Sequence, residues 1–410
     1  MQKVYFDNSA TSLPKAPGVS VAMKDFLDMQ GYNVGRGAYA GSLDTALEIM
    51  RTRELLADFF GAAHPRKVIF TPGFTQAINM ILSGFLDEGD HVITTSLEHN
   101  SVMRPLHALS KRGLSYDIAP CDENGVLDPA RIVELIKPST KAVIMSHASN
   151  VCGTVLPLDD VGRICKEQGL RFIVDGAQTA GVIDIKVSDS NIDALAFPGH
   201  KALLGPQGIG GFVISEDFAE HVDATLWGGT GSLSHGLEQP QFLPDKFESG
   251  TMNIPGILGL KAAVEYVQAE GVEAIHKKEM QLYQHFVDAA RELEGMRLIA
   301  VGNTSSTGTA ACNKTSTDNN IHNKLQKVAV ISVDFPHHDN AEIATLLDKE
   351  YDIMARCGLH CSPSAHKTLG TYPEGTLRFS FGHKNTIEEV DYLVKSLRAI
   401  LSSKGINCGV

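Results

Sequence analysis

The stretch RFIVDGAQTAG, residues 171–181, changes abruptly from an apolar run to polar residues and glycine. Its first half has the length and composition of a buried strand, and Asp175 stands where that strand would end. The stretch ALAFPGHKALLGPQGIGG, residues 194–211, repeats the pattern with His200 and Lys201 after the apolar run. Two neighbouring strands that end in charged residues predict a binding edge on a parallel sheet.

Strand-like runs also lie at residues 67–73, 91–99 and 141–150, and most are followed by helical periodicity, as in TQAINMILSGFL at 75–86. Near-continuous apolar strands that alternate with helices predict a mostly parallel sheet, of the seven-stranded type, with helices on both faces. The carboxyl ends of such strands form one edge. We expect these polar residues to meet there: Thr75, His99, Asn150, Asp175, Gln178, His200 and Lys201.

The pattern changes near residue 260. Two helical segments, 256–268 and 277–294, lead to shorter strands at 328–335 and 376–382 and to a last helix at 386–401. We therefore predict an α/β fold with a large domain over residues 15–260. A smaller α+β domain would be formed by residues 1–14 and 261–410. The polar segment 302–324 is interpreted as a surface loop without a site.

Composition excludes several classes of protein. The 410 residues carry 36 Lys and Arg against 48 Asp and Glu, a formal charge of −12, which argues against nucleic-acid or anionic-membrane partners. No run approaches 18 apolar residues and no signal peptide is recognised, so we expect a cytoplasmic protein. Seven cysteines, an odd number in a long chain, suggest free thiols in a reducing compartment.

The charged residues at the predicted edge suit pyridoxal phosphate. A lysine such as Lys201 forms a Schiff base with this cofactor, and a carboxylate such as Asp175 keeps its pyridine nitrogen protonated. Gly73 allows a close backbone approach, and Thr75 opens a helix whose N-terminus attracts phosphate. His99 is placed to lie flat on the ring. Each residue alone has an ordinary structural reading, as a surface lysine or a helix cap, but their joint order favours a cofactor site.

The chain resembles class V aminotransferase-fold enzymes, which have the fold type I architecture of pyridoxal-phosphate-dependent transferases. Within them it is similar to the cysteine desulfurase and selenocysteine lyase branch. The resemblance is carried by FDNSATS, FTPGFTQAIN, EHNSV, HASNVCGT, VDGAQTAG, GHK, GPQGIGG, FESGTMN, RCGLHC and LRFSFGHKNTIEEVD, which span nearly the whole chain.

The resemblance implies a role for each matching residue. Lys201 and Asp175 match the Schiff-base lysine and the partner of the ring nitrogen, Gln178 touches the phenolic oxygen, and His99 stacks on the ring. The remaining cofactor contacts would be Gly73, Phe74, Thr75, Asn150, His200 and, from the second subunit of a homodimer, Thr251. Asn150 and Arg378, assisted by Arg356, would hold the substrate carboxylate.

Three positions depart from the family pattern. Phe74 and Pro198 stand where many relatives have hydroxyl residues that contact the phosphate, so the pocket would lose one or two donors, at about 1 kcal/mol each. Tyr39 replaces a histidine often found near the substrate entrance.

The cluster RCGLHC allows several interpretations of Cys361. Zinc usually takes two spaced pairs of ligands, but Cys357 and Cys361 have no second pair, and a disulfide is disfavoured in a reducing compartment, so we expect no metal. Burial is the ordinary fate of a thiol, and we accept it for the other six cysteines. Cys361, on a predicted loop beside His360 and near Arg356, is instead a candidate nucleophile. The resemblance implies that it carries a persulfide.

We therefore expect an enzyme that removes sulfur from L-cysteine, giving L-alanine and a Cys361 persulfide for an acceptor protein. Selenocysteine is the alternative substrate. Another reaction of the same cofactor also stays open: β-elimination from cysteine or cystine, epimerisation or transamination. These need no thiol, so Cys361 discriminates between them. A non-catalytic binding protein is a further alternative, against which the retained Lys201, Asp175, His99 and Arg378 argue.

Overall fold

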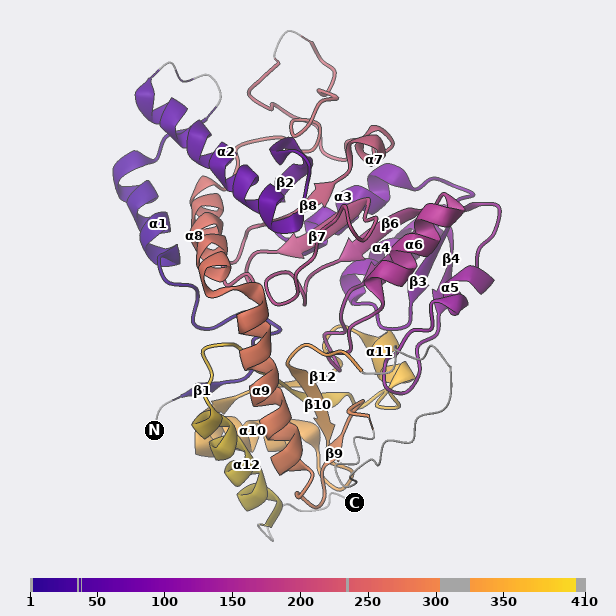
Figure 1. Cartoon of the computed structure of the whole chain (residues 1–410), viewed down its shortest axis with the longest axis vertical. Helices are drawn as coiled ribbons and strands as arrows, with labels where there is room; N and C mark the ends of the chain where they lie inside the picture. The colour runs from indigo at the N-terminus through magenta and orange to yellow at the C-terminus, as the bar shows by residue number, and fades with distance from the viewer. Residues whose placement is uncertain (1–2, 35–36, 38, 234–235, 303–324, 403–410) are drawn as a thin grey trace, which may run out of the picture.

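The computed structural model describes residues 3–34, 37, 39–233, 236–302 and 325–402 of the chain (Figure 1). Its largest sheet has seven strands. In spatial order these are β2 (Val68–Thr71), β8 (Gly210–Ile214), β7 (Ala194–Pro198), β6 (Arg171–Asp175), β5 (Thr140–Ser146), β3 (His91–Thr95) and β4 (Ser115–Ala119). Only β8 runs antiparallel to its neighbours, so the sheet is mostly parallel, as predicted.

Both faces of this sheet are buried because successive side chains of a strand point to opposite sides. In β5, Ala142 and Ile144 enter one apolar core, whereas Val143 and Met145 enter another. The first core is completed by α3 (Phe74–Phe85), α4 (Asn100–Ser110) and α7 (Glu216–Glu220). The second is completed by α1 (Val19–Asp25), the π-helix η1 (Phe26–Gln30), α2 (Ala40–Phe60), α5 (Ala130–Glu134), α6 (Leu158–Gln168) and α8 (Ile254–Glu270). The predicted covering by helices on both faces is confirmed.

A smaller part of the molecule lies below the large sheet in the view of Figure 1. Its antiparallel sheet has the order β12 (Arg356–Gly358), β13 (Thr376–Ser380), β10 (Val330–Asp334) and β9 (Arg297–Leu298). Around it lie α9 (Val272–Ala290), α10 (Asn340–Tyr351), α11 (Pro363–Thr368) and α12 (Ile387–Ser402). The N-terminal strand β1 (Val4–Tyr5) pairs in parallel with β11 (Ile353–Met354).

Some features were not expected from the sequence. Strands β4 and β8 were not predicted: β4 is partly exposed, and β8 begins inside the glycine-rich GPQGIGG. The short 3-10 helix η2 (Pro65–Lys67), which His64 caps, was also not predicted. Residue 260 lies inside α8, and the core changes within α9, where Ile275 still packs in the core of the large sheet and Leu282 in that of the smaller part. The domain bounds stay a prediction, and residues 303–324 of the predicted loop lie outside the described part.

The fold turns the carboxyl ends of β2, β5, β6 and β7 toward β12 and β13 of the small sheet. The N-terminal segment runs between the two parts, with Asp7 bridged to Ser380 of β13 and Ser12 bonded to the His200 carbonyl. Residues from three distant parts of the chain therefore meet in one place. None of the described helices is long and apolar enough to span a bilayer.

Candidate active site

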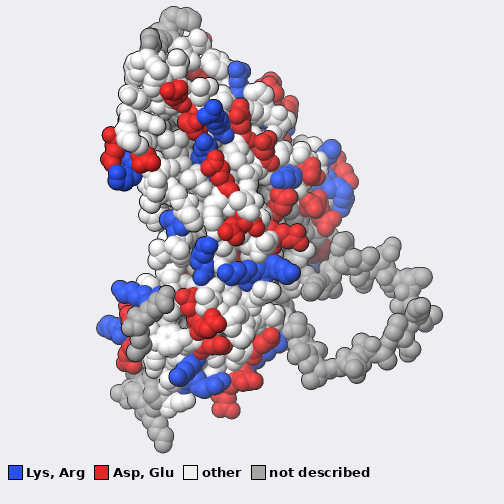
Figure 2. Space-filling model, turned by 60° about the vertical axis from the view of Figure 1, so that its left-hand side comes forward, with Lys and Arg blue, Asp and Glu red and all other residues white. Residues whose placement is uncertain are grey.

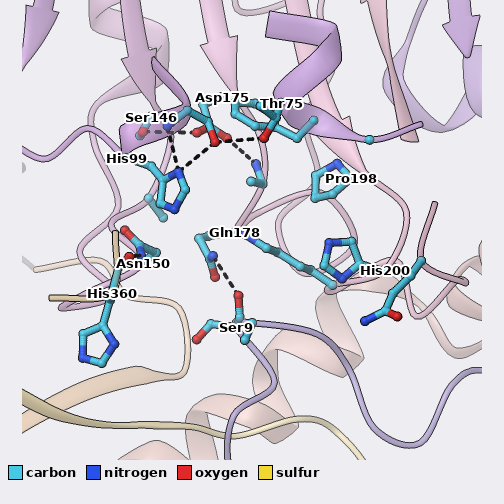
Figure 3. Close-up of a pocket in the computed structure, with 18 of the residues that line it drawn as sticks. Ser9, Thr75, His99, Ser146, Asn150, Asp175, Gln178, Pro198, His200 and His360 are labelled. Atoms are coloured by element: carbon cyan, nitrogen blue, oxygen red, sulfur yellow. Dashed lines mark hydrogen bonds between the residues drawn. The ribbon is translucent and has the colours of Figure 1, made fainter. Parts of the chain in front are cut away.

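A cavity of about 720 Å³ opens between the large sheet and the small one (Figure 3). Of the predicted site residues, all but Cys361 and Thr251 line it: Gly73, Phe74, Thr75, His99, Asn150, Asp175, Gln178, His200, Lys201, Arg356 and Arg378. The sequence thus predicted most of the wall of one cavity, although the role of each residue stays a prediction.

Lys201 and Asp175 form the charged centre of this cavity. Lys201 lies three residues after the end of β7, and its surroundings lower its pKa from 10.5 to about 8, mainly through burial and also through nearby Arg378 and Arg356. Asp175, at the end of β6, is buried and accepts a hydrogen bond from the Ala177 N–H at 2.7 Å. Burial raises the pKa of Asp175 to about 6. The amine is therefore closer to its neutral, nucleophilic form than a surface lysine at the same pH.

His99 lies at the cavity wall and caps the N-terminus of α4. Its Nδ1 accepts the backbone N–H of Ser101 at 3.1 Å, so the proton of the neutral ring is on Nε2. Burial, with added repulsion from Lys201 and Arg356, lowers the pKa of His99 to about 4. The ring is thus neutral near pH 7 and offers an N–H donor rather than a positive charge.

The end of the cavity around α3 has the features of an anion site. Gly73 caps α3, whose first backbone N–H groups have no partner within the helix. The buried Nδ1 of His200 has no hydrogen-bond partner among the described residues. Phe74 and Pro198 line the wall without a hydroxyl, as expected. Ser101, which the sequence analysis missed, places its Oγ 3.0 Å from Thr75 Oγ1 and supplies a hydroxyl there.

Arg378 occupies the opposite, small-domain side of the cavity and is only 1% exposed. One Nη donates to the backbone carbonyl of Asn150 at 3.0 Å, and the other pairs with Asp7 Oδ1 at 2.5 Å. Its Nε is buried with no partner in the described structure. Asp7 belongs to FDNSATS, a motif to which no site residue was assigned. Its carboxylate compensates the buried guanidinium, while Nε stays free to donate to a ligand.

Cys361 lies beside the cavity but does not line it. Its thiol is exposed, with Sγ 3.9 Å from Arg356 Nη2. His360 and Cys361 have positive φ angles, 49° and 59°, which are uncommon for residues with a Cβ. The predicted loop location is correct, since both residues lie in a turn between β12 and α11. Its neighbour Ser362 was missed.

Burial separates Cys361 from the other described thiols. Cys152 and Cys165 are buried, and Cys121 and Cys357 are half-buried. Desolvation raises the pKa of Cys121 and of Cys165 to about 12, and it also raises the pKa of Cys357. Cys361 is therefore the accessible thiol of the described residues. Cys312 and Cys408 lie outside that part of the chain.

Thr251 is exposed and lies away from the cavity wall of its own chain. The segment before it is tied to an exposed loop: Ser249 Oγ donates to the Leu226 carbonyl at 3.2 Å, and the Gly250 N–H donates to the Gly229 carbonyl at 2.9 Å. Trp227 on that loop is 76% exposed. Thr251 thus sits on an outward surface, where a second molecule can reach it.

The fold and the cavity define an α/β enzyme whose site is built around a lysine and a carboxylate on neighbouring strands. The family model of class V aminotransferases matches residues 4–393, and the chain belongs to this family. A probable cysteine desulfurase of Methanothermobacter thermautotrophicus is 31% identical over 402 residues, covering 97% of this chain and 94% of the relative. One from Pyrococcus abyssi is 32% identical over 417 residues, with 97% and 95% coverage.

Solved structures that are similar to this chain also include cysteine desulfurases. The apo structure of cysteine desulfurase from Thermococcus onnurineus NA1 superposes with a TM-score of 0.86 at 31% identity, covering 97% of this chain and 94% of that one. The cysteine desulfurase CsdA from Escherichia coli has a TM-score of 0.84 at 28% identity, with the same coverage. The predicted fold class and family are confirmed.

Proposed function

We propose that this protein is a pyridoxal-phosphate-dependent cysteine desulfurase. It removes sulfur from L-cysteine, gives L-alanine and leaves a persulfide on Cys361 for transfer to an acceptor protein. The observation that carries the proposal is the cavity in which Lys201 and Asp175 face Arg378, with the exposed Cys361 thiol beside it. We place the reaction in the cytoplasm, where reducing conditions keep this thiol free.

The residues of the cavity fit the cofactor. Lys201 supplies the amine, Asp175 the carboxylate for the ring nitrogen, and Gln178 an amide for the phenolic oxygen. Gly73, Phe74 and Thr75 at the start of α3 would hold the phosphate, for which the unpartnered Nδ1 of His200 is a further donor. When bound, pyridoxal phosphate supplies a ring that withdraws electrons from the substrate Cα.

Substrate binding falls to the small-domain side. The free Nε of Arg378 would donate to the cysteine carboxylate, with Asn150 and Arg356 beside it. The pairing with Asp7 fixes the orientation of the guanidinium before the substrate arrives. We propose that the carboxylate binds on this side, so that the substrate amine and Cα lie toward Lys201.

Proton and sulfur transfer would be divided between three residues. Lys201 Nζ removes the proton at Cα, since its lowered pKa allows a neutral amine near pH 8. The neutral His99 holds a proton on Nε2 beside the reacting atoms. The Cys361 thiolate attacks the substrate sulfur. A new S–S bond forms as the Cβ–S bond breaks, so that L-cysteine and the Cys361 thiol become L-alanine and a persulfide.

The proposed assembly is a homodimer in which Thr251 contacts the phosphate of the other subunit. Apolar side chains are exposed on η1 and α2 and on the loop around Trp227, including Leu27 and Met29 of η1 and Leu43 of α2. Figure 2 shows mostly uncharged surface on the left of the upper half of the molecule, with one cluster of charged side chains at its edge. Several large exposed apolar side chains on one part of a surface are typical of an interface between protein molecules.

The proposal is tested by incubating purified protein and L-cysteine and measuring alanine and enzyme-bound persulfide. The wild type should be yellow, and borohydride should fix the cofactor on Lys201. Cys361→Ala should keep the cofactor and lose the persulfide and most of the alanine, whereas Cys357→Ala should resemble the wild type. Full cysteine activity in Cys361→Ala would show a β-eliminating lyase. Activity retained only with selenocysteine would indicate a selenocysteine lyase.

A further inference from the structure

A second carboxylate lies behind the proposed cofactor site. Glu98, which directly precedes His99, has no exposed surface. Its Oε1 accepts the Thr95 hydroxyl at 2.6 Å and its Oε2 accepts the Ser146 hydroxyl at 2.7 Å, while the Ser146 N–H lies 3.0 and 3.1 Å from the two oxygens. No salt bridge to Glu98 is formed by the part of the chain that the structure describes. An ionised carboxylate is costly in such a place, so a proton is expected there over part of the physiological pH range.

Ser146 connects this carboxylate to Asp175. Its Oγ lies 2.7 Å from Glu98 Oε2 and 3.5 Å from Asp175 Oδ2, at the ends of two adjacent strands (Figure 3). A hydroxyl has one proton to donate, so it can serve only one of these carboxylates at a time. Burial raises the pKa of Glu98 to about 7 and that of Asp175 to about 6, and the negative charge of Asp175 raises the pKa of Glu98 further. Near neutral pH the two carboxyl groups therefore share protons.

We propose that Glu98 is a positioning residue that sets the protonation state of Asp175 through the Ser146 hydroxyl. When Glu98 is protonated, its O–H donates to Ser146 Oγ, and the Ser146 O–H donates to Asp175 Oδ2. When Glu98 loses its proton to solvent, the Ser146 O–H turns back to Glu98. Asp175 then keeps the Ala177 N–H and faces a second negative charge. Only protons move between these states.

The inference deepens the proposed function, because it rests on Asp175 as the partner of the cofactor's ring nitrogen. An ionised Glu98 adds negative potential at that end of the cavity, which favours the protonated ring nitrogen as the pH rises. The other titratable groups nearby are Lys201, which lowers the pKa of Asp175, and Cys121, whose thiol lies near Glu98. Both are unchanged in the variants below.

The test compares E98Q with E279Q. Glu279 on α9 is another buried carboxyl, whose pKa burial raises to about 8, and it accepts the backbone N–H of His383 rather than a site residue. Apoprotein is titrated with pyridoxal phosphate by calorimetry in buffers of different ionisation enthalpy, from pH 5.5 to 8.5. This gives the number of protons exchanged on binding. Ring-¹⁵N-labelled cofactor in the same proteins reports the protonation of the ring nitrogen by NMR.

We expect the number of protons exchanged on cofactor binding to differ between E98Q and the wild type by up to about one. This difference should change with pH near pH 7. The ring nitrogen of E98Q should lose its proton about one pH unit lower than in the wild type. E279Q should follow the wild type in both measurements. Identical profiles for E98Q and the wild type, or the same change in E279Q, would overturn the inference.

Two further variants cover the case in which E98Q does not fold. S146A keeps both carboxylates but removes the bridging hydroxyl, and E98D keeps the charge. The inference requires S146A to shift the ¹⁵N profile and E98D to stay nearer the wild type; the reverse order contradicts it. Wild-type apoprotein that binds no pyridoxal phosphate would remove both the proposed function and this inference. Normal binding with unaltered variant profiles would remove the inference alone.

Discussion

Burial is what gives the individual site residues their chemistry. Lys201, His99 and Asp175 all lose solvent at the edge of the sheet, and in each case burial is the largest cause of the change in pKa. The same physical effect disfavours the charged form of a base and of an acid. It therefore brings an amine toward neutrality, keeps an imidazole neutral and makes a carboxylate more basic.

The first prediction concerns the pH dependence of cofactor capture. Only the neutral amine attacks the aldehyde, and the pKa of Lys201 is lowered to about 8, so the rate should rise with pH around a midpoint near 8. The measurement is the absorbance change after mixing apoprotein with pyridoxal phosphate. Lys15→Met is the matched control, because burial also lowers the pKa of Lys15 to about 8. It should retain the profile, and a midpoint near 10.5 in the wild type would contradict the assignment.

The second prediction concerns substrate capture by Arg378. A lysine at this position keeps the positive charge but loses the planar guanidinium. In Arg378 the two Nη atoms of that group bond Asn150 and Asp7, and Nε is free to bind a ligand. Arg378→Lys should lower kcat/KM for cysteine about 30-fold, which corresponds to a loss of roughly 2 kcal/mol of transition-state stabilisation. The spectrum of the bound cofactor should stay normal. Arg297→Lys, which changes an exposed arginine paired with Asp334, should have no such effect. Unaltered kinetics in Arg378→Lys would place the carboxylate elsewhere.

Among the elements, the turn between β12 and α11 matters most, because it carries the proposed nucleophile. Three hydrogen bonds tie it to the rim of the large sheet. The Asn100 N–H donates to the Cys361 carbonyl at 2.8 Å, Asn150 Nδ2 to the His360 carbonyl at 2.8 Å, and Ser362 Oγ to Asn150 Oδ1 at 2.7 Å. The turn is thus held at the cavity by contacts with both the His99 and the Asn150 segments. We therefore expect sulfur transfer to depend on how firmly this turn is held.

The third prediction is that Ser362→Ala loosens this turn. Losing the hydrogen bond to Asn150 should cost about 1 kcal/mol locally, since the buried amide oxygen loses its donor. Amide hydrogen exchange should accelerate over residues 359–362, and persulfide formation should slow while cofactor binding is retained. Ser364→Ala, at the start of α11, is the matched control. Faster exchange without any change in persulfide formation would show that the anchoring does not serve sulfur transfer.

At the scale of the whole molecule, the large sheet, the small sheet and a second subunit each contribute to the proposed site. The first two meet in the single chain, where Arg378, paired with Asp7, lines the cavity opposite the large sheet. The third is proposed to supply Thr251 from the surface that carries Trp227. This tryptophan is the only one in the chain, so its fluorescence reports on that surface alone.

The fourth prediction is that Trp227→Asp weakens the dimer and the cofactor site together. A charge on an apolar interface is costly to bury, so sedimentation should show dissociation at concentrations where the wild type is a dimer. Affinity for pyridoxal phosphate should fall with it, because Thr251 no longer reaches the other subunit. Trp227→Phe preserves the apolar surface and should retain both properties. A dimeric Trp227→Asp with normal cofactor affinity would place the interface elsewhere.

Local patterns in the sequence determined the strands that carry the site and the placement of Thr75, His99, Asp175 and Lys201 at one edge of the sheet. Burial on both faces produces continuous apolar runs, and the carboxyl ends of parallel strands share one edge, so these features could be predicted without a structure. The glycine-rich β8 and the half-exposed β4 lack that signal and were missed.

Only the tertiary structure decided which partners these residues have. Asp7 and Arg378 are 371 positions apart, and the hydroxyl of Ser146 joins Glu98 to Asp175 across two strands. No periodicity encodes such contacts, because they depend on how strands, turns and the N-terminal segment pack. The shifts in pKa follow from the same packing, since desolvation and nearby charge exist only once the chain has folded around the site.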